Sequence, residues 1–165
     1  MASKRPRIEP LPLLVALGLP LAAGAVGAVA TSSSVRTWYP TLRKPPFNPP
    51  GWVFGPVWTL LYVLMGISLY LVWTGVGSRS GRLRMARWWL AQLVLNLGWS
   101  LIFFGRRAIG PAFIEIIVLW LAIAGTIRAA HAERRPAAVL LLPYLAWTTF
   151  AAVLNGSLWH LNRER

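Results

Sequence analysis

Apolar residues fill most of the chain in five long intervals, which are separated by polar or basic stretches. The intervals are residues 11–30, 51–77, 88–105, 108–127 and 136–159. Each reaches the roughly 18 to 20 residues that an α-helix needs to cross about 30 Å of hydrocarbon. Strands of a transmembrane β-barrel would be segments of about 10 residues that alternate apolar and polar, and no interval alternates in that way. The pattern predicts an all-α integral membrane protein with a bundle of five transmembrane helices.

The connectors between the predicted helices differ in length. Residues 78–87, 106–107 and 128–135 form three short ones, whereas the first connector covers residues 31–50. Its part "WYPTLRKPPFNPP" is rich in prolines, which cannot continue a helix because each lacks an amide donor and fixes φ. We therefore expect a stiff, lid-like loop at one end of a single five-helix domain, residues 1–165, without an internal repeat.

The composition agrees with a membrane location. The chain is 56% hydrophobic and has four acidic residues, which is too little polar surface to cover a soluble globule. Its formal net charge of +13 would suggest nucleic acid in a soluble protein. Here the basic residues lie between apolar runs, where they meet lipid headgroups, so we expect a lipid membrane as partner and no nucleic acid. The absence of cysteine excludes disulfides and thiolate chemistry.

Lysine and arginine are unevenly distributed between the two sides of the predicted bundle. One side has Lys4, Arg5, Arg7, Arg79, Arg82, Arg84, Arg87, Arg128, Arg134 and Arg135, and the other has Arg36, Arg43, Lys44, Arg106, Arg107, Arg163 and Arg165. This asymmetry favours a cytoplasmic amino terminus. Arginine provides 15 of the 17 basic residues, which is typical of a GC-rich bacterial genome. We expect a multi-pass membrane protein of a bacterium. The sequence does not distinguish the inner from the outer membrane.

The first apolar interval has two interpretations. The basic residues at positions 4–7, the apolar run and the small residues 28–30 resemble a cleaved signal peptide. The run is longer than a usual signal core, so we favour a transmembrane helix. Gly24 and Ala28 have small-xxx-small spacing, which allows close packing either within the bundle or in a dimer.

Helical spacing places aromatic and amide side chains on shared faces of three predicted helices. The faces contain Trp58, Tyr62, Met65 and Leu69, then Gln92, Asn96, Trp99 and Phe103, and finally Tyr144, Trp147, Ala151 and Asn155. Amides are costly in hydrocarbon, so these faces should turn inward, and the small Ala151 leaves room between the rings. They predict a cavity for a flat, largely apolar macrocycle, with Arg43 and Lys44 at its mouth for negatively charged groups.

Structural roles are the alternative interpretation of many of these residues. Tryptophan and tyrosine form anchoring belts at membrane interfaces, a role that we favour for Trp38, Tyr39, Trp52, Trp88, Trp89 and Trp159. Trp58, Trp99 and Trp147 lie deeper in their intervals, where we favour the cavity. Asn96 and Asn155 fit hydrogen bonding between helices as well as ligand binding.

Glu115 is the one charge inside an interval. An intramembrane carboxylate is a functional candidate by default, yet Glu115 could also reach the interface or pair with Arg106 or Arg107. His131 and His160 end consecutive antiparallel helices, so they lie on opposite faces and cannot clamp one haem iron. We expect no metal site, and no Ser/His/Asp triad or phosphate-binding glycine loop is present.

Motifs spread over residues 36–160 resemble one known family. They are Trp38-Tyr39, Leu42, Lys44-Pro45, Pro49-Pro50, Trp52-Val53-Phe54, Pro56-Val57-Trp58, Leu61-Tyr62, Asn96, Trp99, "IFFG" at 102–105, "PYLAW" at 143–147, Leu154-Asn155 and Trp159. At these spacings the chain resembles the TspO/MBR family of tryptophan-rich sensory proteins and translocator proteins. The resemblance implies a five-helix membrane protein, commonly a homodimer, that binds porphyrins and related hydrophobic molecules in a pocket closed by the first connector.

The resemblance also implies which ligands and which reaction to expect, and the sequence departs from the family pattern in two places. Protoporphyrin IX-like molecules would be ligands, and no cofactor is required. Some bacterial members degrade bound porphyrin in light, and the tryptophans involved correspond to Trp58 and Trp147. Animal members bind sterols and benzodiazepine-type ligands, but Gly156 and His160 replace the Tyr and the Lys or Arg of the sterol pattern. Pro111 stands where some animal relatives carry a pocket tryptophan.

We therefore predict a porphyrin-binding membrane protein that acts as a sensor, regulator or scavenger of tetrapyrroles. The predicted ligand-binding residues are Trp38, Tyr39, Arg43, Lys44, Trp52, Trp58, Tyr62, Asn96, Trp99, Phe103, Tyr144, Trp147, Ala151 and Asn155. Two alternatives stay open: a light-dependent porphyrin-degrading enzyme that uses Trp58 and Trp147, and a transporter of porphyrins or sterols. An odd number of spans does not divide into the inverted halves of many transporters.

Overall fold

The computed structural model describes residues 8–75 and 77–163, within which all regular secondary structure is helical. The elements are α1 (Pro10–Thr37), a 3₁₀ turn (Tyr39–Thr41), α2 (Gly51–Trp73), α3 (Arg79–Ser100), a π-helical segment (Leu101–Gly105), α4 (Ile109–Glu133), α5 (Arg135–Val139) and α6 (Leu142–Asn162). Five helical units are long and apolar enough to cross a membrane, namely α1, α2, α3 with the π segment, α4, and α5 with α6. The predicted all-α membrane fold is confirmed.

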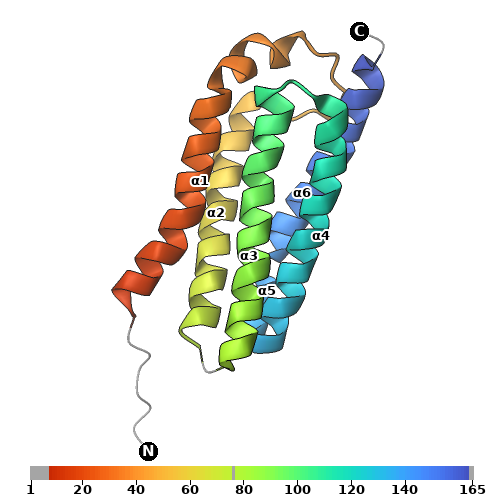
Figure 1. Ribbon diagram of the computed structural model, residues 1–165. Helices are drawn as coiled ribbons and strands as arrows, with labels where there is room; N and C mark the ends of the chain where they lie inside the picture. The colour runs from red at the N-terminus through yellow and green to blue at the C-terminus, as the bar shows by residue number, and fades with distance from the viewer. Residues whose placement is uncertain (1–7, 76, 164–165) are drawn as a thin grey trace, which may run out of the picture.

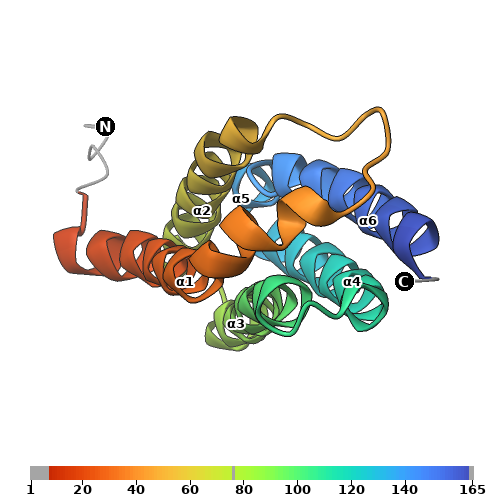
Figure 2. The same ribbon diagram turned by 90° about the horizontal axis from the view of Figure 1, so that it is seen from above.

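The five units run alternately up and down in one bundle (Figure 1). The loop of residues 38–50 leaves the upper end of α1 and arches over to the upper end of α2. In the view along the bundle, this loop swings out past α6 before it returns (Figure 2). It is therefore placed to cover the space enclosed by the upper halves of α1, α2 and α6.

Helix α1 continues to Thr37, so the predicted boundary at residue 30 is wrong. The polar run that follows residue 30 stays helical because its hydroxyls bond to carbonyls one turn earlier. Thr31 Oγ1 donates to the Gly27 carbonyl at 2.7 Å, and Thr37 Oγ1 donates to the Ser33 carbonyl at 2.9 Å. The loop is consequently shorter than the predicted range 31–50 and begins at residue 38.

Other helix ends also differ from the apolar intervals. Helix α3 begins at Arg79 and not at residue 88, because Ser78 caps it by accepting a hydrogen bond from the Gly81 amide at 2.9 Å. Helix α2 ends at Trp73, before the predicted end at residue 77. Helices α4 and α6 end at Glu133 and Asn162, after the predicted ends at residues 127 and 159. Hydropathy marks the part of a helix that faces hydrocarbon, whereas helical hydrogen bonds continue into the headgroup region. The predicted span 136–159 is interrupted between α5 and α6, because Pro143 has no amide to donate to the Val139 carbonyl.

Helices α1 and α2 pack closely through small residues. Pro20, inside α1, cannot donate to the Ala16 carbonyl. This carbonyl faces Gly66 of α2 so closely that a Cβ atom added at Gly66 would lie 2.6 Å from the oxygen. Higher in the bundle, Gly24 lies against the ring of Tyr62. Gly24 therefore serves packing within the bundle, as one of the two sequence interpretations predicted.

The main core fills the lower half of the bundle with Met65, Met85, Trp89, Ile123 and Tyr144, each at most 2% exposed. The belt prediction for Trp89 is wrong, because its indole is buried and donates to the Met65 carbonyl at 3.0 Å. The helix that starts at Arg79 puts Trp89 one turn after Met85 on the inward face. Its neighbour Trp88 is 42% exposed, on the outer side of α3.

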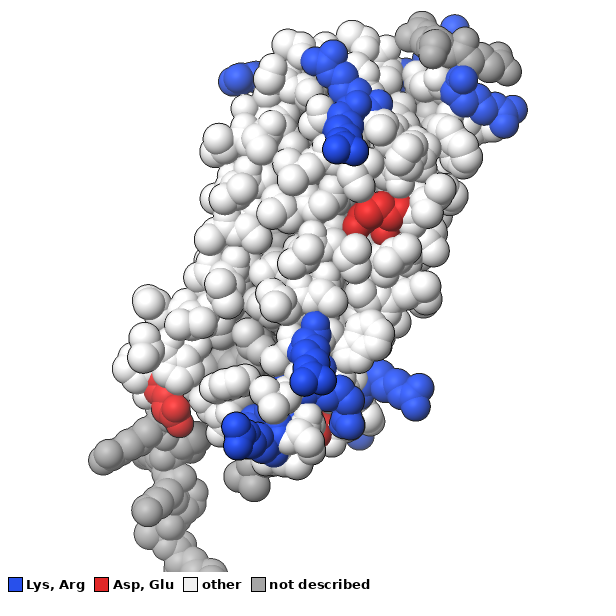
Figure 3. Space-filling view, viewed as in Figure 1, with Lys and Arg blue, Asp and Glu red and all other residues white. Residues whose placement is uncertain are grey.

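Basic side chains gather at the two ends of the bundle, with a broad and largely uncharged band between them (Figure 3). This distribution is the one expected for a protein whose middle lies in hydrocarbon and whose ends meet headgroups. Lys4, Arg5, Arg7 and Arg165, which the orientation argument used, lie outside the described residues. The cytoplasmic amino terminus stays a prediction.

Candidate functional site

A cavity of about 930 Å³ lies beneath the loop 38–50, between the upper halves of α1, α2 and α6 and the end of α3 with its π segment. Its volume lies within the range of about 300 to 1,000 Å³ that is common for ligand sites. Most of the side chains around it are apolar or aromatic. The cavity is therefore suited to a hydrophobic molecule of substantial size.

A layer of hydrogen bonds closes the cavity from below. The Tyr62 hydroxyl donates to Asn96 Oδ1 at 2.8 Å, and Asn96 Nδ2 donates to the Tyr144 hydroxyl at 3.1 Å. These bonds join α2, α3 and α6 across the bundle. Asn96 and Tyr144 are at most 2% exposed and do not line the cavity, unlike Tyr62. For Asn96 the structure agrees with hydrogen bonding between helices, and both residues support the floor without direct access to a ligand.

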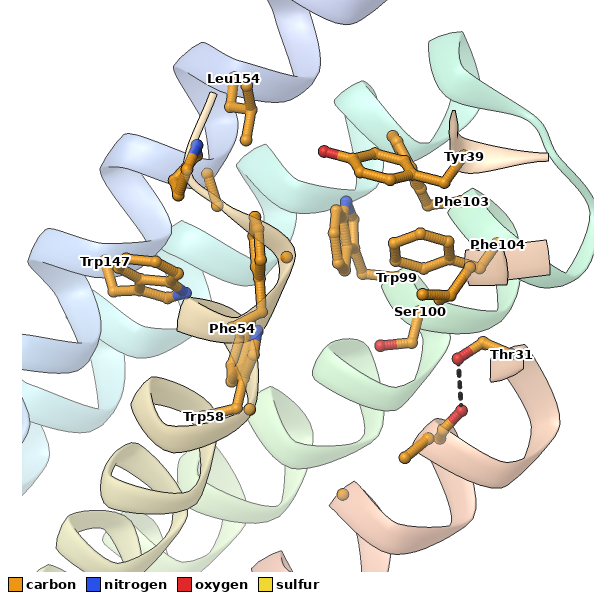
Figure 4. A pocket seen from close by; sticks show the side chains of 18 of the residues that line it. Thr31, Tyr39, Phe54, Trp58, Trp99, Ser100, Phe103, Phe104, Trp147 and Leu154 are labelled. Carbon is orange, nitrogen blue, oxygen red and sulfur yellow. Dashed lines mark hydrogen bonds between the residues drawn. The ribbon is translucent and has the colours of Figure 1, made fainter. Parts of the chain in front are cut away.

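Two aromatic walls face each other across the cavity (Figure 4). The α2–α6 wall consists of Phe54, Trp58 and Trp147, in which the rings of Phe54 and Trp147 meet edge to face with centroids 5.9 Å apart. The α3 wall consists of Trp99, Phe103 and Phe104, together with Tyr39 from the loop.

Within the α3 wall, the rings of Trp99 and Phe103 are stacked with centroids 5.2 Å apart. Here the backbone is π-helical, and the Arg106 amide donates to the Leu101 carbonyl at 2.9 Å. A π-helical turn inserts an extra residue into the helical repeat and so re-aims the side chains that follow it. The resulting space between the two walls is a slot lined by aromatic rings.

Two indole N–H groups of the α2–α6 wall, those of Trp58 and Trp147, have no hydrogen-bond partner among the described residues. Among the described residues, Trp147 Nε1 is the only buried side-chain nitrogen or oxygen that both belongs to a cavity-lining residue and lacks a hydrogen bond. The Trp99 indole and the Asn155 amide are paired, because Trp99 Nε1 donates to Asn155 Oδ1 at 3.0 Å and Asn155 Nδ2 donates to the Ile109 carbonyl at 2.9 Å. An unpaired buried donor costs free energy, and the Trp147 N–H is covered by neighbouring atoms although the residue lines the cavity.

The loop is held over the cavity by its own hydrogen bonds. The Tyr39 hydroxyl donates to Asn48 Oδ1 at 2.7 Å. Burial raises the pKa of the Tyr39 phenol, an effect that the hydrogen bond to Asn48 partly opposes, so the phenol keeps its proton and acts as the donor. Farther along, the Arg43 amide donates to Asn162 Oδ1 at 3.0 Å, and Asn162 Nδ2 donates to the Arg43 carbonyl at 2.9 Å. The loop is thus anchored to the end of α6.

The two basic residues of the loop differ in position. Lys44 lines the cavity, and its ammonium lies 5.0 Å from the centre of the Tyr39 ring. It also donates to the carbonyls of Pro40 and Leu42 at 3.1 and 3.2 Å. Arg43 is exposed, lies outside the cavity lining and contributes its backbone to the anchor on α6. Of the predicted pair, Lys44 alone is placed at the cavity.

The structure brings nine of the predicted ligand-binding residues together. The residues that line the cavity are Tyr39, Lys44, Trp58, Tyr62, Trp99, Phe103, Trp147, Ala151 and Asn155. Trp38, Arg43, Trp52, Asn96 and Tyr144 do not line it. Trp52 is 76% exposed on the outside of α2, and Trp38 packs edge-on against Phe103 at 5.7 Å between ring centroids. The sequence motif gives proximity along the chain but not the direction of each side chain, and ligand binding by these five residues stays a prediction.

Other cavity residues were missed. Phe54 precedes Trp58 by four residues, and this helical spacing could have identified it. The lining from α1, including Gly24 and Thr31, carries no comparable signal, because α1 is apolar around most of its circumference. Asn48 was not predicted either, because the conformation of the loop and the hydrogen bond from Tyr39 determine where its side chain lies.

Glu115 lies in α4 and is not part of the cavity lining. Both carboxylate oxygens are buried without a hydrogen-bond partner among the described residues. The suggested pairing with Arg106 or Arg107 is not found, since the ion pair within the described ranges joins Arg84 and Glu133 at 3.7 Å. No group of three histidine, cysteine, aspartate or glutamate residues in residues 8–75 and 77–163 could hold a metal ion.

Comparison with known proteins agrees with this architecture. A profile of the TspO/MBR family matches residues 16–160. The chain is 40% identical to the tryptophan-rich protein TspO of Chlorobaculum tepidum, over 92% of this chain and 96% of the relative. It is 39% identical to the translocator protein of Bos taurus, over 89% and 88% of the two chains, and 37% identical to the tryptophan-rich sensory protein of Cereibacter sphaeroides, over 86% and 89%. The chain therefore belongs to the TspO/MBR family.

Proposed function

We propose that this protein binds porphyrins and related flat, hydrophobic molecules in the cavity under the loop. The observation that carries the proposal is the slot between the α2–α6 wall and the α3 wall, both of which are built of aromatic rings that line the same cavity. A porphyrin is a planar aromatic ring with apolar substituents, so it can stack on both walls. A cavity of about 930 Å³ has room for part or all of such a ring.

The polar groups around the slot fit the edge of the same ligand. The Trp147 N–H is buried and unpaired, and a rotation of the indole toward the slot would let it donate to a nitrogen or oxygen acceptor on the ligand. Lys44 at the mouth can exchange its bonds to the carbonyls of Pro40 and Leu42 for a propionate carboxylate. Such an exchange is favourable because a hydrogen bond between two charged groups is stronger than one to a neutral carbonyl.

Replacing Trp147 by phenylalanine is expected to weaken protoporphyrin IX binding about tenfold, because the variant keeps a ring in the wall but loses the free donor. Quenching of the remaining tryptophan fluorescence during a porphyrin titration measures the affinity. The matched control is Trp73→Phe, at the lower end of α2 and 50% exposed, which should bind as the unmodified protein does. Equal affinities for both variants would remove Trp147 from the site, and no saturable quenching in any of the three proteins would refute porphyrin binding.

We propose a role as sensor, regulator or scavenger of tetrapyrroles. Relatives are named as sensory and as translocator proteins, and both names are compatible with a ligand that is bound within the membrane and not altered. Saturable porphyrin flux into proteoliposomes would favour transport instead. A homodimer and a bacterial membrane stay predictions from the sequence.

A light-dependent porphyrin-degrading activity is the second candidate, and it is favoured because Trp58 and Trp147 line the same cavity. Under this alternative, the Trp58→Phe, Trp147→Phe double variant should lose light-driven bleaching of protoporphyrin IX at concentrations that saturate the site. Absorbance is followed in the light and in the dark, with Trp73→Phe as the control. Bleaching that proceeds at the same rate in the double variant would exclude the two indoles as reactants.

A further inference from the structure

The cavity has an open side between the upper halves of α1 and α2. Seven of its lining residues are exposed on these two helices. Leu21 and Val35 of α1 are the larger ones, 37% and 43% exposed. The other five are small: Ala25 and Ala28 in α1, and Gly51, Gly55 and Thr59 in α2. Because α1 and α2 both span the membrane, this side faces the bilayer and not water. We call the gap bounded by these five residues the lateral opening.

The lateral opening exists because α1 and α2 separate toward the loop. Lower down they are in close contact, at Gly66 against Ala16 and at Gly24 against Tyr62. Above that level the upper end of α2 lies well apart from the upper end of α1, as the view along the bundle shows (Figure 2). A Cβ atom added at Gly51 or Gly55 would meet nothing within 4 Å, so no neighbouring side chain fills the gap.

The loop closes the side of the cavity that faces water, unlike the side that faces the bilayer. The loop crosses it with the Tyr39–Asn48 hydrogen bond and with two bonds between the Arg43 backbone and Asn162. Its prolines restrict the backbone further, which reduces the number of conformations the loop can adopt. Opening this side would require several of these bonds to break together, whereas the lateral opening requires no bond to break.

We propose that ligands reach the cavity sideways from the hydrocarbon of the bilayer, through the lateral opening. The class of ligand is therefore an amphipathic molecule that partitions into membranes, with a flat apolar part that passes between α1 and α2. The small residues at the opening set its width, so they control the rate of binding more than the affinity. This inference rests on the proposed function only for the choice of porphyrin as the probe.

Two chemical locks compare the two routes. The chain has no cysteine, so introduced pairs are the only thiols. A pair at Ala28→Cys and Gly55→Cys, joined by a bifunctional maleimide, closes the lateral opening. The matched pair at Arg43→Cys and Asn162→Cys fixes the loop to α6 instead. In lipid nanodiscs, the first lock is expected to slow protoporphyrin IX association about tenfold, and the second to leave it within about twofold of the unmodified rate.

The opposite ranking, or equal slowing by both locks, would overturn the lateral route.

A second measurement does not depend on porphyrin binding. Ala151→Cys, on the cavity wall, should react faster with a membrane-soluble maleimide than with a charged one, and adding Gly55→Phe should slow the membrane-soluble reagent selectively. If protoporphyrin IX fails to bind the unmodified protein, the proposed function fails, and the maleimide rates still decide the route. A rate of reaction with the membrane-soluble maleimide that is unchanged by Gly55→Phe would contradict the lateral route.

Discussion

Replacing Ala151 by tryptophan is expected to lower the affinity for protoporphyrin IX by at least about 100-fold. Ala151 lies one turn after Trp147 on α6 and lines the cavity. An indole at this position would occupy the space between the two aromatic walls, and the close packing below the cavity leaves it nowhere else to go. The change therefore removes the slot while it adds apolar surface, so the protein should fold and yet bind poorly.

The control for this experiment is Ala132→Trp, which adds the same side chain at an exposed position in the last turn of α4, remote from the cavity. Affinities are measured by porphyrin titration, and thermal unfolding in the same detergent checks that both variants are folded. Retention of full affinity in Ala151→Trp would mean that the ligand does not use the slot.

Replacing Asn96 by leucine is expected to lower the free energy of unfolding by about 2 kcal/mol. Asn96 accepts from the Tyr62 hydroxyl and donates to the Tyr144 hydroxyl. Leucine has a similar size but no polar atoms, so both hydroxyls would be left without a partner in the interior of a membrane bundle. The loss falls on three helices at once, because this layer joins α2, α3 and α6.

Ser100→Ala is the matched control on the same helix. The Ser100 hydroxyl makes one long bond of 3.4 Å to the Asn96 carbonyl, so its removal should cost well under 1 kcal/mol. Unfolding by a denaturing detergent, followed by circular dichroism, gives both values. Equal stability of the two variants would contradict a structural role for the layer, and a change in porphyrin affinity without a change in stability would place Asn96 in direct contact with ligand.

The sequence was most informative where one physical requirement acts over many residues. Crossing hydrocarbon needs about 20 apolar positions in a row, and all five spanning units were predicted from that requirement alone. The inward faces followed from helical periodicity, which correctly grouped Trp58 with Tyr62 and Trp147 with Ala151.

The remaining features depend on the contacts of individual side chains, which the hydropathy pattern does not record. The end of α1 depends on hydroxyl groups such as that of Thr31, which bond back to the helix where hydropathy suggests a loop. Trp89 is buried because it lies four residues after Met85 and three before Gln92, on the inward face of α3. The anchoring of the loop by Asn162 joins positions 119 residues apart, and no local pattern encodes such a pairing.

The most direct test of the account is a density map of the protein with protoporphyrin IX bound in a lipid nanodisc. We predict the macrocycle in the slot, with one face toward Trp99 and Phe103, the other toward Trp147, and the loop above it. Density for the ring in the shallow outer groove between α4 and α6, lined by Phe113, Gly156 and His160, would contradict the central claim.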